Sequence, residues 1–267
     1  METSSKFNGL DWFSVMIQIF TSVVNRPDFV NLQNKLFQKF LKKDYQFHIV
    51  DDSIDSEISD QFQSICLENQ FSYYKKPERK NPMNPAQACA DTVQWTYDNI
   101  IQKNHLDDIV FFCDSDLFLI DEFNIEDYMS DAIIAGLPQK RGEVTYMWNG
   151  IMFFNMPKIT DLDINFSDGV VEGEMTDVGG HTYYYFKKNN IEMKKTDEEF
   201  PLYPTHFGDI EIQNDEVTKG YNFELHLGGK FLHYRAATNW HSNWRDSNDP
   251  LFKKTEIFNT IIGELLK

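Results

Sequence analysis

The spacing of apolar residues near the start of the chain predicts a strand, a helix and a second strand. Residues 15–24 form an apolar, β-branched run that ends at Asn25-Arg26-Pro27, which indicates a strand followed by a loop. From residue 28 to about residue 43, apolar side chains recur at helical spacing, and Asp28 is the expected helix cap. Residues 45–50 form a second strand-like run. A strand, a helix and a strand at this spacing are typical of a βαβ unit and hence of a parallel sheet.

The rest of the chain continues to alternate between helical and strand-like patterns. We expect, in chain order, a helix at 85–104, a strand that carries 111–120, strands at 132–137 and 143–155, an acidic loop at 169–180, a short aromatic helix at 181–190, a hairpin of 221–226 and 230–235, and an amphipathic packing helix at 251–266. The sequence contains no internal repeat or low-complexity linker, so one α/β domain over residues 1–267 is the simplest account.

Composition and charge restrict the partners. The chain has 267 residues and a formal charge of −17, which disfavours binding to nucleic-acid phosphates or to an anionic membrane surface. An anionic substrate therefore needs local compensation, most simply by a metal ion. The cysteines Cys66, Cys89 and Cys113 match neither a zinc-binding spacing nor a disulfide framework, and we interpret them as free thiols. The sequence shows neither a signal peptide nor an apolar stretch of ~18 residues, so we expect a cytoplasmic protein without an integral membrane segment.

Two carboxylates interrupt the apolar run of residues 111–120. Side chains at i and i+2 of an extended segment project to the same side, so Asp114 and Asp116 can aim at one point. Converging carboxylates repel each other, and a hard divalent cation with oxygen ligands relieves that repulsion. The alternative is a strand that ends in a polar turn, since Asp and Ser are common turn residues. Because burying unpaired charge is costly, the apolar surroundings favour a metal site.

Four polar groups are expected at the ends of strands. They are Asn25-Arg26, Asp51-Asp52, Asp114-Ser115-Asp116 and Trp148-Asn149-Gly150. In open α/β sheets ligands bind beyond the carboxyl ends of the strands, so we expect these groups to share one site. Asp51 or Asp52 would hold a nucleoside through a base N–H or a ribose hydroxyl, and the acid pair would hold a metal ion on a diphosphate.

The order of these polar groups along the chain resembles that in the glycosyltransferases of the GT-A fold. The DxD motif of that family is similar to Asp114-Ser115-Asp116. The segments that carry the likeness are Val23-Val24-Asn25-Arg26, Val50-Asp51-Asp52-Ser53, Asp114-Ser115-Asp116, residues 148–155 and residues 233–240. The resemblance implies an α/β, Rossmann-like fold with a mostly parallel central sheet flanked by helices and a small acceptor-side subregion. It also implies a nucleotide-binding half at about 15–120, an acceptor and metal-completing half at about 121–240, and a C-terminal packing helix at about 250–267.

The resemblance further implies a metal site and a nucleotide site. Asp114 and Asp116 would engage Mn²⁺ or Mg²⁺ with His233 as the third ligand, and an imidazole among carboxylates favours Mn²⁺. Taken alone, His233 would be interpreted as a satisfied histidine in an aromatic strand; its place after the acid pair favours a ligand. The residues expected around the nucleotide of a UDP- or GDP-sugar are Val23, Asn25, Arg26, Asp51, Asp52 and Ser115.

Asp177 is the expected catalytic carboxylate, with Glu174 and Glu172 as substitutes. In inverting members of the family a carboxylate at this place removes the proton of the acceptor hydroxyl, and in retaining members the region contacts the donor sugar. A structural role is the alternative, because Thr176 or Asp177 is also a suitable helix N-cap.

The implied function is that of a metal-dependent glycosyltransferase, which moves a sugar from a nucleotide-diphosphate sugar to a hydroxyl of a glycan or glycoconjugate. Trp148 would stack on a sugar ring or pack in the core, and Asn149 would hydrogen-bond the donor or acceptor sugar. One alternative is a phosphatase of the haloacid-dehalogenase type, which also has DxD after an apolar strand but normally has Thr or Val where this chain has Phe118. The other is a nucleotide-sugar-binding protein without catalytic activity.

The chain departs from one branch of the family near its end. Glycogenin-like retaining enzymes end in His-x-x-Gly-x-x-Lys-Pro-Trp, whereas this chain has Ala236 in place of the glycine and no Lys-Pro before Trp240. We therefore expect Arg235, Arg245 or the basic loop of residues 75–80 to supply positive charge for the diphosphate.

Overall fold

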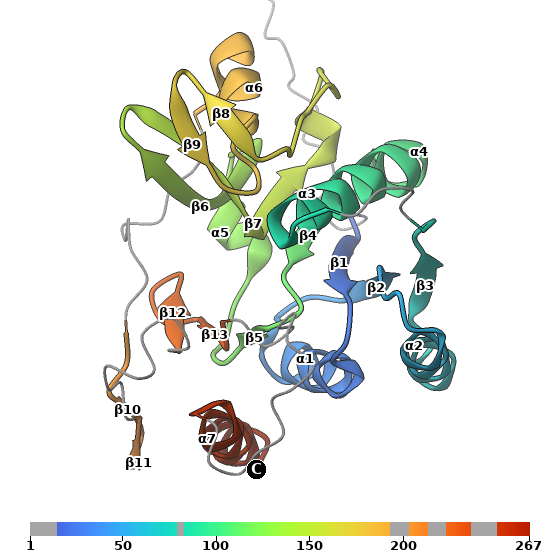
Figure 1. The fold of residues 1–267 in the computed structure, drawn as a ribbon, viewed down its shortest axis with the longest axis vertical. Coiled ribbons are helices and arrows are strands. Elements are labelled where there is room, and N and C mark those ends of the chain that lie inside the picture. The colour runs from blue at the N-terminus through green and yellow to red at the C-terminus, as the bar shows by residue number, and fades with distance from the viewer. Residues whose placement is uncertain (1–14, 79–82, 193–202, 213–222, 236–249) are drawn as a thin grey trace, which may run out of the picture.

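The centre of the computed structural model, which describes residues 15–78, 83–192, 203–212, 223–235 and 250–267, is a six-stranded sheet in the order β3-β2-β1-β4-β7-β6 (Figure 1). Its strands are β1 (Ile17–Val23), β2 (Tyr45–Asp51), β3 (Ser72–Lys75), β4 (Ile109–Cys113), β6 (Ile134–Arg141) and β7 (Val144–Asn155). Strands β3, β2, β1 and β4 are parallel, whereas β7 is antiparallel to both β4 and β6. The predicted βαβ unit is confirmed, and so is a mixed α/β fold with a mostly parallel sheet flanked by helices.

Helices cover both faces of this sheet (Figure 1). One face carries α1 (Pro27–Phe40) and α2 (Ser56–Asn69), and the other carries α3 (Pro85–Thr96), a π-helical turn (Tyr97–Ile101) and α4 (Gln102–Asn104). Successive side chains of a strand point to opposite faces. Phe111 of β4 therefore packs in one core with Phe37 and Phe62, while Phe112 packs in a second core with Val93 and Tyr97.

The start of α1 differs from the prediction. Pro27 occupies the first turn, where its missing N–H costs nothing, and Arg26 is the N-cap residue. The prediction that Asp28 caps this helix is wrong; its carboxylate instead forms an ion pair with Arg26 at 2.6 Å. The helix ends at Phe40 because Leu41 adopts an extended conformation.

The acidic segment 169–180 was predicted as a loop, and that prediction is wrong. It contains an antiparallel hairpin of β8 (Gly169–Val171) and β9 (Glu174–Thr176). The two turn residues, Glu172 and Gly173, have φ values of 48° and 88°, and two positive φ values are typical of a tight two-residue hairpin turn. The other short elements between residues 125 and 211 are α5 (Ile125–Met129), a 3₁₀ turn (Met156–Lys158), α6 (Thr182–Asn189), β10 (His206–Phe207) and β11 (Ile210–Glu211).

Among the described residues, no helix combines the length and the apolar character that crossing a bilayer requires.

A small second sheet and the last helix complete the fold. The sheet has the order β12-β13-β5, with β5 (Leu117–Leu119), β12 (Glu224–His226) and β13 (Phe231–His233), and the helix is α7 (Pro250–Leu265). The predicted hairpin and C-terminal helix are therefore confirmed. Phe258 of α7 packs against Phe29 of α1 and Phe118 of β5, which holds this sheet against the main domain. Because β13 pairs with β5, the end of β13 lies directly beside the acid pair.

Candidate functional site

The acid pair lies in a tight turn between β4 and β5. The backbone N–H of Leu117 donates to the carbonyl of Asp114 at 3.1 Å, and the N–H of Asp114 donates to the carbonyl of Gly150 at 2.9 Å. The expectation that both acids belong to an extended segment is therefore wrong, and the alternative of a polar turn at the strand end describes the backbone. The turn still keeps both carboxylates at one cavity.

Gln33 of α1 holds this turn in place through two hydrogen bonds. Its carboxamide N–H group donates to the carbonyls of Asp114 at 2.8 Å and Leu117 at 2.9 Å, and the side chain is completely buried. The sequence reasoning missed this residue. A glutamine on the apolar face of a predicted helix was the available signal, since buried polar groups need partners.

Asp114, Asp116 and His233 line the same cavity, and Asp116 is the acid that contacts the His233 ring. His233 Nε2 lies 3.3 Å from Asp116 Oδ1, and both residues are buried. Burial raises the pKa of Asp114 to about 7, with repulsion from Asp116 adding to the effect. Burial alone lowers the pKa of His233, but the carboxylates of Asp116 and Glu224 outweigh it and raise the pKa to about 9. Both groups therefore tend to hold a proton, because crowded buried carboxylates attract positive charge; a divalent cation would supply that charge in place of the protons.

Glu224 and His226 of β12 were not predicted, and they lie against His233. Glu224 Oε2 is 2.8 Å from His233 Nδ1 and 3.5 Å from His226 Nε2, and all three side chains are buried. Their ligand atoms lie within 4.8 Å of one another. The signal was a Glu-x-His pair in a predicted strand, whose two side chains project to one side. Its significance depends on the cross-strand pairing of Glu224 with His233, which the sequence alone does not fix.

A cavity of about 290 Å³ gathers most of the predicted site. The predicted residues that line it are Asp52, Asp114, Ser115, Asp116, Trp148, Asn149, Asp177 and His233. Other lining residues include Ser22, Val24, Cys89 and Thr92. The cavity lies at the carboxyl ends of β1, β2 and β4, the edge at which ligands bind in parallel α/β sheets.

Asp177 reaches this cavity from the turn between β9 and α6. Its side chain is exposed, and one carboxylate oxygen accepts the N–H of Val178 at 2.8 Å. The alternative that Thr176 or Asp177 caps α6 is wrong, because His181 is the N-cap residue and Thr176 donates to the carbonyl of Gly169. The substitutes Glu172 and Glu174 are exposed on the hairpin and are not part of the cavity lining in the described chain.

Trp148 and Asn149 lie within β7 rather than at a strand end. Strand β7 is antiparallel to β4, so its middle passes the edge where β4 ends. The Trp148 ring packs against the rings of His226 and His233, with centroids 5.4 Å away in each case. Asn149 Nδ2 lies 2.9 Å from the sulfur of Cys89, and burial raises the pKa of that thiol, so the sulfur stays protonated.

The predicted nucleotide residues fall into two groups. Asp52 and Ser115 line the cavity, whereas Val23, Asn25, Arg26 and Asp51 are not among the lining residues in the described part of the chain. The Asp51 carboxylate is fully buried and accepts hydrogen bonds from the backbone N–H of Ser53 and from the Tyr73 hydroxyl. The Arg26 guanidinium lies over the Phe29 ring, 3.6 Å from its centroid. Contacts of this second group with a nucleotide stay predictions.

Three of the cations expected near the diphosphate are described, and each pairs with an acid; Lys75 pairs with Asp51 at 3.1 Å. Lys76 is buried and pairs with Asp91 at 2.6 Å and with Asp52 at 3.7 Å. Arg235 pairs with Glu224 at 3.1 Å. The other expected cations, Arg79, Lys80 and Arg245, lie outside the described residues, as does the segment 236–240.

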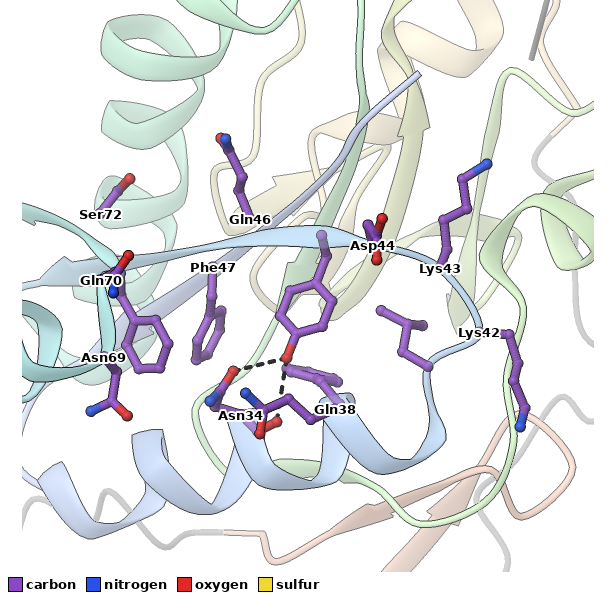
Figure 2. A pocket seen from close by; sticks show the side chains of 14 residues that line it. Asn34, Gln38, Lys42, Lys43, Asp44, Gln46, Phe47, Asn69, Gln70 and Ser72 are labelled. Carbon is purple, nitrogen blue, oxygen red and sulfur yellow. Dashed lines mark hydrogen bonds between the residues drawn. The ribbon is translucent and has the colours of Figure 1, made fainter. Parts of the chain in front are cut away.

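A larger cavity of about 850 Å³ lies at the start of β2 and the ends of α1 and α2 (Figure 2). Its lining is rich in amides, and the hydroxyl of Tyr45 donates to Asn34 Oδ1 at 2.8 Å. Lys42 and Lys43 at its rim pair with acidic residues of a neighbouring segment. Asp44 is the one acidic side chain in its described lining, so this cavity lacks the convergent carboxylates and imidazole of the smaller one.

Comparison with known proteins gives distant structural similarities. No protein-family model matches the chain, and no curated protein matches its sequence. A mannosyltransferase from S. cerevisiae is 9% identical, with 54% of this chain and 56% of that chain covered and a TM-score of 0.37. A mannosyltransferase from Pyrobaculum calidifontis, solved with GDP-Man and Mn²⁺, is 11% identical, with 68% and 55% covered and a TM-score of 0.44.

A third solved structure covers more of both chains. It is a protein of Desulfovibrio desulfuricans assigned as a nucleotide-diphospho-sugar transferase, 13% identical, with 94% of this chain and 98% of that chain covered and a TM-score of 0.44. This chain therefore spans little more than half the length of the two mannosyltransferases but nearly the whole of the third protein. It is distantly similar in shape to these three transferases.

Proposed function

We propose that this protein is a metal-dependent glycosyltransferase of the GT-A type, which moves a sugar from a nucleoside-diphosphate sugar to a hydroxyl of a glycan or glycoconjugate. The observation that carries the proposal is the meeting of Asp114, Asp116 and His233 at one cavity, at the carboxyl edge of a parallel sheet. The −17 charge of the chain agrees with it, because an anionic donor then requires a cation at the site.

Two of the three expected ligands are spaced to share a divalent ion, and Asp114 lines the same cavity. Asp116 Oδ1 and His233 Nε2 lie 3.3 Å apart, which is near the ~3 Å between neighbouring ligands of an ion with metal–ligand distances of ~2.1 Å. The mixture of carboxylate and imidazole favours Mn²⁺ over Mg²⁺. When bound, the ion would stabilise the negative charge that develops on the diphosphate leaving group.

The protein's own residues would orient the donor. Asp52 and Ser115 line the cavity beside the acid pair and would hydrogen-bond the nucleoside of a UDP- or GDP-sugar. Lys76 lies next to Asp52, where it limits the repulsion between that carboxylate and a diphosphate. Asn149 would bind a sugar hydroxyl through its amide, and Trp148 would offer a ring face to the sugar.

Asp177 would act on the acceptor. Its exposed carboxylate lies on a turn at the cavity, within reach of a hydroxyl that enters from solvent. In an inverting reaction it would remove the proton of that hydroxyl as the hydroxyl attacks the anomeric carbon. In a retaining reaction it would contact the donor sugar instead.

A panel of UDP- and GDP-sugars tests the proposal. Release of nucleoside diphosphate is measured with Mn²⁺, with Mg²⁺ and with a chelator, and we expect release from at least one donor that depends on the ion. Release of phosphate from phosphomonoesters would favour the phosphatase alternative. Binding of a nucleotide sugar without turnover, with any acceptor, would favour a binding protein.

A further inference from the structure

The carboxylate of Glu224 contacts three side chains, and it lies on the side of His233 that faces away from the acid pair. It lies 2.8 Å from His233 Nδ1, 3.5 Å from His226 Nε2 and 3.1 Å from the Arg235 guanidinium. Glu224 is the direct cross-strand partner of His233 in the β12–β13 hairpin, and its side chain is buried. The two nitrogens of the His233 ring therefore face two different carboxylates, those of Glu224 and Asp116.

This arrangement restricts the protonation of the ring. A histidine that binds an ion is neutral, with one N–H and one lone pair, and an ionised carboxylate only accepts hydrogen bonds. The shorter contact, from Nδ1 to Glu224, takes the N–H, which leaves the lone pair of Nε2 directed to the side of Asp116. The opposite tautomer would place the Nδ1 lone pair against the Glu224 carboxylate at the shorter distance of 2.8 Å, whereas the Nδ1–H tautomer leaves the lone pair at the longer, 3.3 Å contact with Asp116, where an ion can be shared.

We propose that Glu224 is a positioning residue that fixes His233 as the Nδ1–H tautomer, so that Nε2 is presented to a divalent ion shared with Asp116. This inference rests on the proposed function, because it assigns a role around the same ion. Carboxylates that orient metal-bound histidines in this way raise the basicity of the ligand and contribute about 10–100-fold to metal affinity.

The same geometry offers a rival arrangement, in which Glu224, His226 and His233 hold an ion themselves. Arg235 argues against it, because its guanidinium already balances the Glu224 carboxylate and would repel a cation at that point. The two arrangements require opposite tautomers of His233. In the rival, Nδ1 binds the ion and Nε2 carries the proton that faces Asp116.

The first test is the affinity for Mn²⁺ alone, measured from free Mn²⁺ by electron paramagnetic resonance. We expect Glu224→Leu to raise the Kd about 10–100-fold. Glu224→Gln, which keeps an acceptor for Nδ1–H, should recover part of this loss. The matched control is His226→Gln, which removes a ring that packs on His233 but keeps the contact between Glu224 and His233 Nδ1, and its Kd should stay within about 2-fold of that of the unaltered protein. An equal loss in His226→Gln and Glu224→Leu would overturn the proposal.

The second test reads the tautomer directly and does not depend on variant stability. Histidine ¹⁵N spectra are recorded on the full chain with Cd²⁺ as a diamagnetic ion, and His233 is assigned with a His233→Gln variant. A proton on Nδ1 and a metal shift on Nε2 are expected; a proton on Nε2 with a metal shift on Nδ1 would overturn the inference. Neither test uses sugar transfer, so Glu224-dependent Mn²⁺ binding without turnover would contradict the proposed function alone.

Discussion

Removal of the Gln33 carboxamide should loosen the turn that carries the acid pair. Gln33→Leu keeps a similar volume in the core but deletes two hydrogen bonds to the carbonyls of Asp114 and Leu117. The Asp114 carbonyl keeps the Leu117 N–H as a partner, so its lost bond costs about 0.5–1.5 kcal/mol, and the lost bond to the Leu117 carbonyl costs about 1–3 kcal/mol. Gln33 Oε1 is itself buried without a hydrogen-bond partner, and its removal returns about 1–3 kcal/mol. The expected net loss is therefore about 1 kcal/mol in the free energy of unfolding.

Gln38→Leu is the matched control, because Gln38 lies on the same helix with an exposed side chain. Urea unfolding of both variants gives the difference in stability, and Mn²⁺ titration of the folded proteins gives the effect on the acid turn. We expect Gln33→Leu to be less stable and to bind Mn²⁺ more weakly, and Gln38→Leu to match the unaltered protein in both. Equal stability and equal Mn²⁺ affinity of the two variants would refute the reasoning that Gln33 holds the turn.

Three further predictions concern acid stability, packing at the cavity and catalysis. Burial raises the pKa of Asp51, but the hydrogen bonds that its carboxylate accepts outweigh burial and hold the pKa below 3.8; its stabilising contribution is therefore present above that pH and lost as the pH falls. Asp51→Asn should remove that part of the acid dependence in urea unfolding between about pH 5 and pH 2, and an unchanged pH profile would contradict it. A Cβ at Gly150 would lie 2.3 Å from the Trp148 ring, so Gly150→Ala should cost about 1–3 kcal/mol, while Gly263→Ala on the exposed side of α7 should not destabilise; equal thermal stability of the two would be the contrary result. If the reaction is inverting, Asp177→Asn should lower kcat about 10²–10⁴-fold and leave Mn²⁺ affinity unchanged, and full activity would exclude a role as base.

The hydrophobic pattern predicted several individual helices and strands, but it did not predict which of them lie side by side in the fold. The strand of residues 17–23, the helix after it and the strand of residues 45–51 follow from periodicity, because each buries one consistent face. Residues 169–180 have few apolar side chains, so their hairpin, whose turn contains Glu172 and Gly173 at positive φ, could not be predicted.

At the site, residue type predicted the chemistry and tertiary pairing decided the geometry. Asp114 and Asp116 were identified from the sequence because acids in an apolar run need a partner, and His233 was identified through the resemblance to the GT-A glycosyltransferases. The role of Glu224 depends on its cross-strand pairing with His233, and the place of Trp148 depends on the direction of β7. Neither pairing nor direction is encoded in a single segment, since both result from how distant segments bury their apolar faces.

The most direct test of the central claim compares two conservative variants in one assay. Asp116→Asn removes a buried carboxylate of the proposed metal site, which follows β4, and Asp107→Asn removes an exposed carboxylate that precedes the same strand. Release of nucleoside diphosphate from the best UDP- or GDP-sugar is measured over a range of Mn²⁺ concentrations. We predict Mn²⁺-dependent release by the unaltered protein and by Asp107→Asn, and a loss of at least about 100-fold in Asp116→Asn. Equal release by all three proteins, or release that persists without a divalent ion, would contradict the proposed metal-dependent transfer.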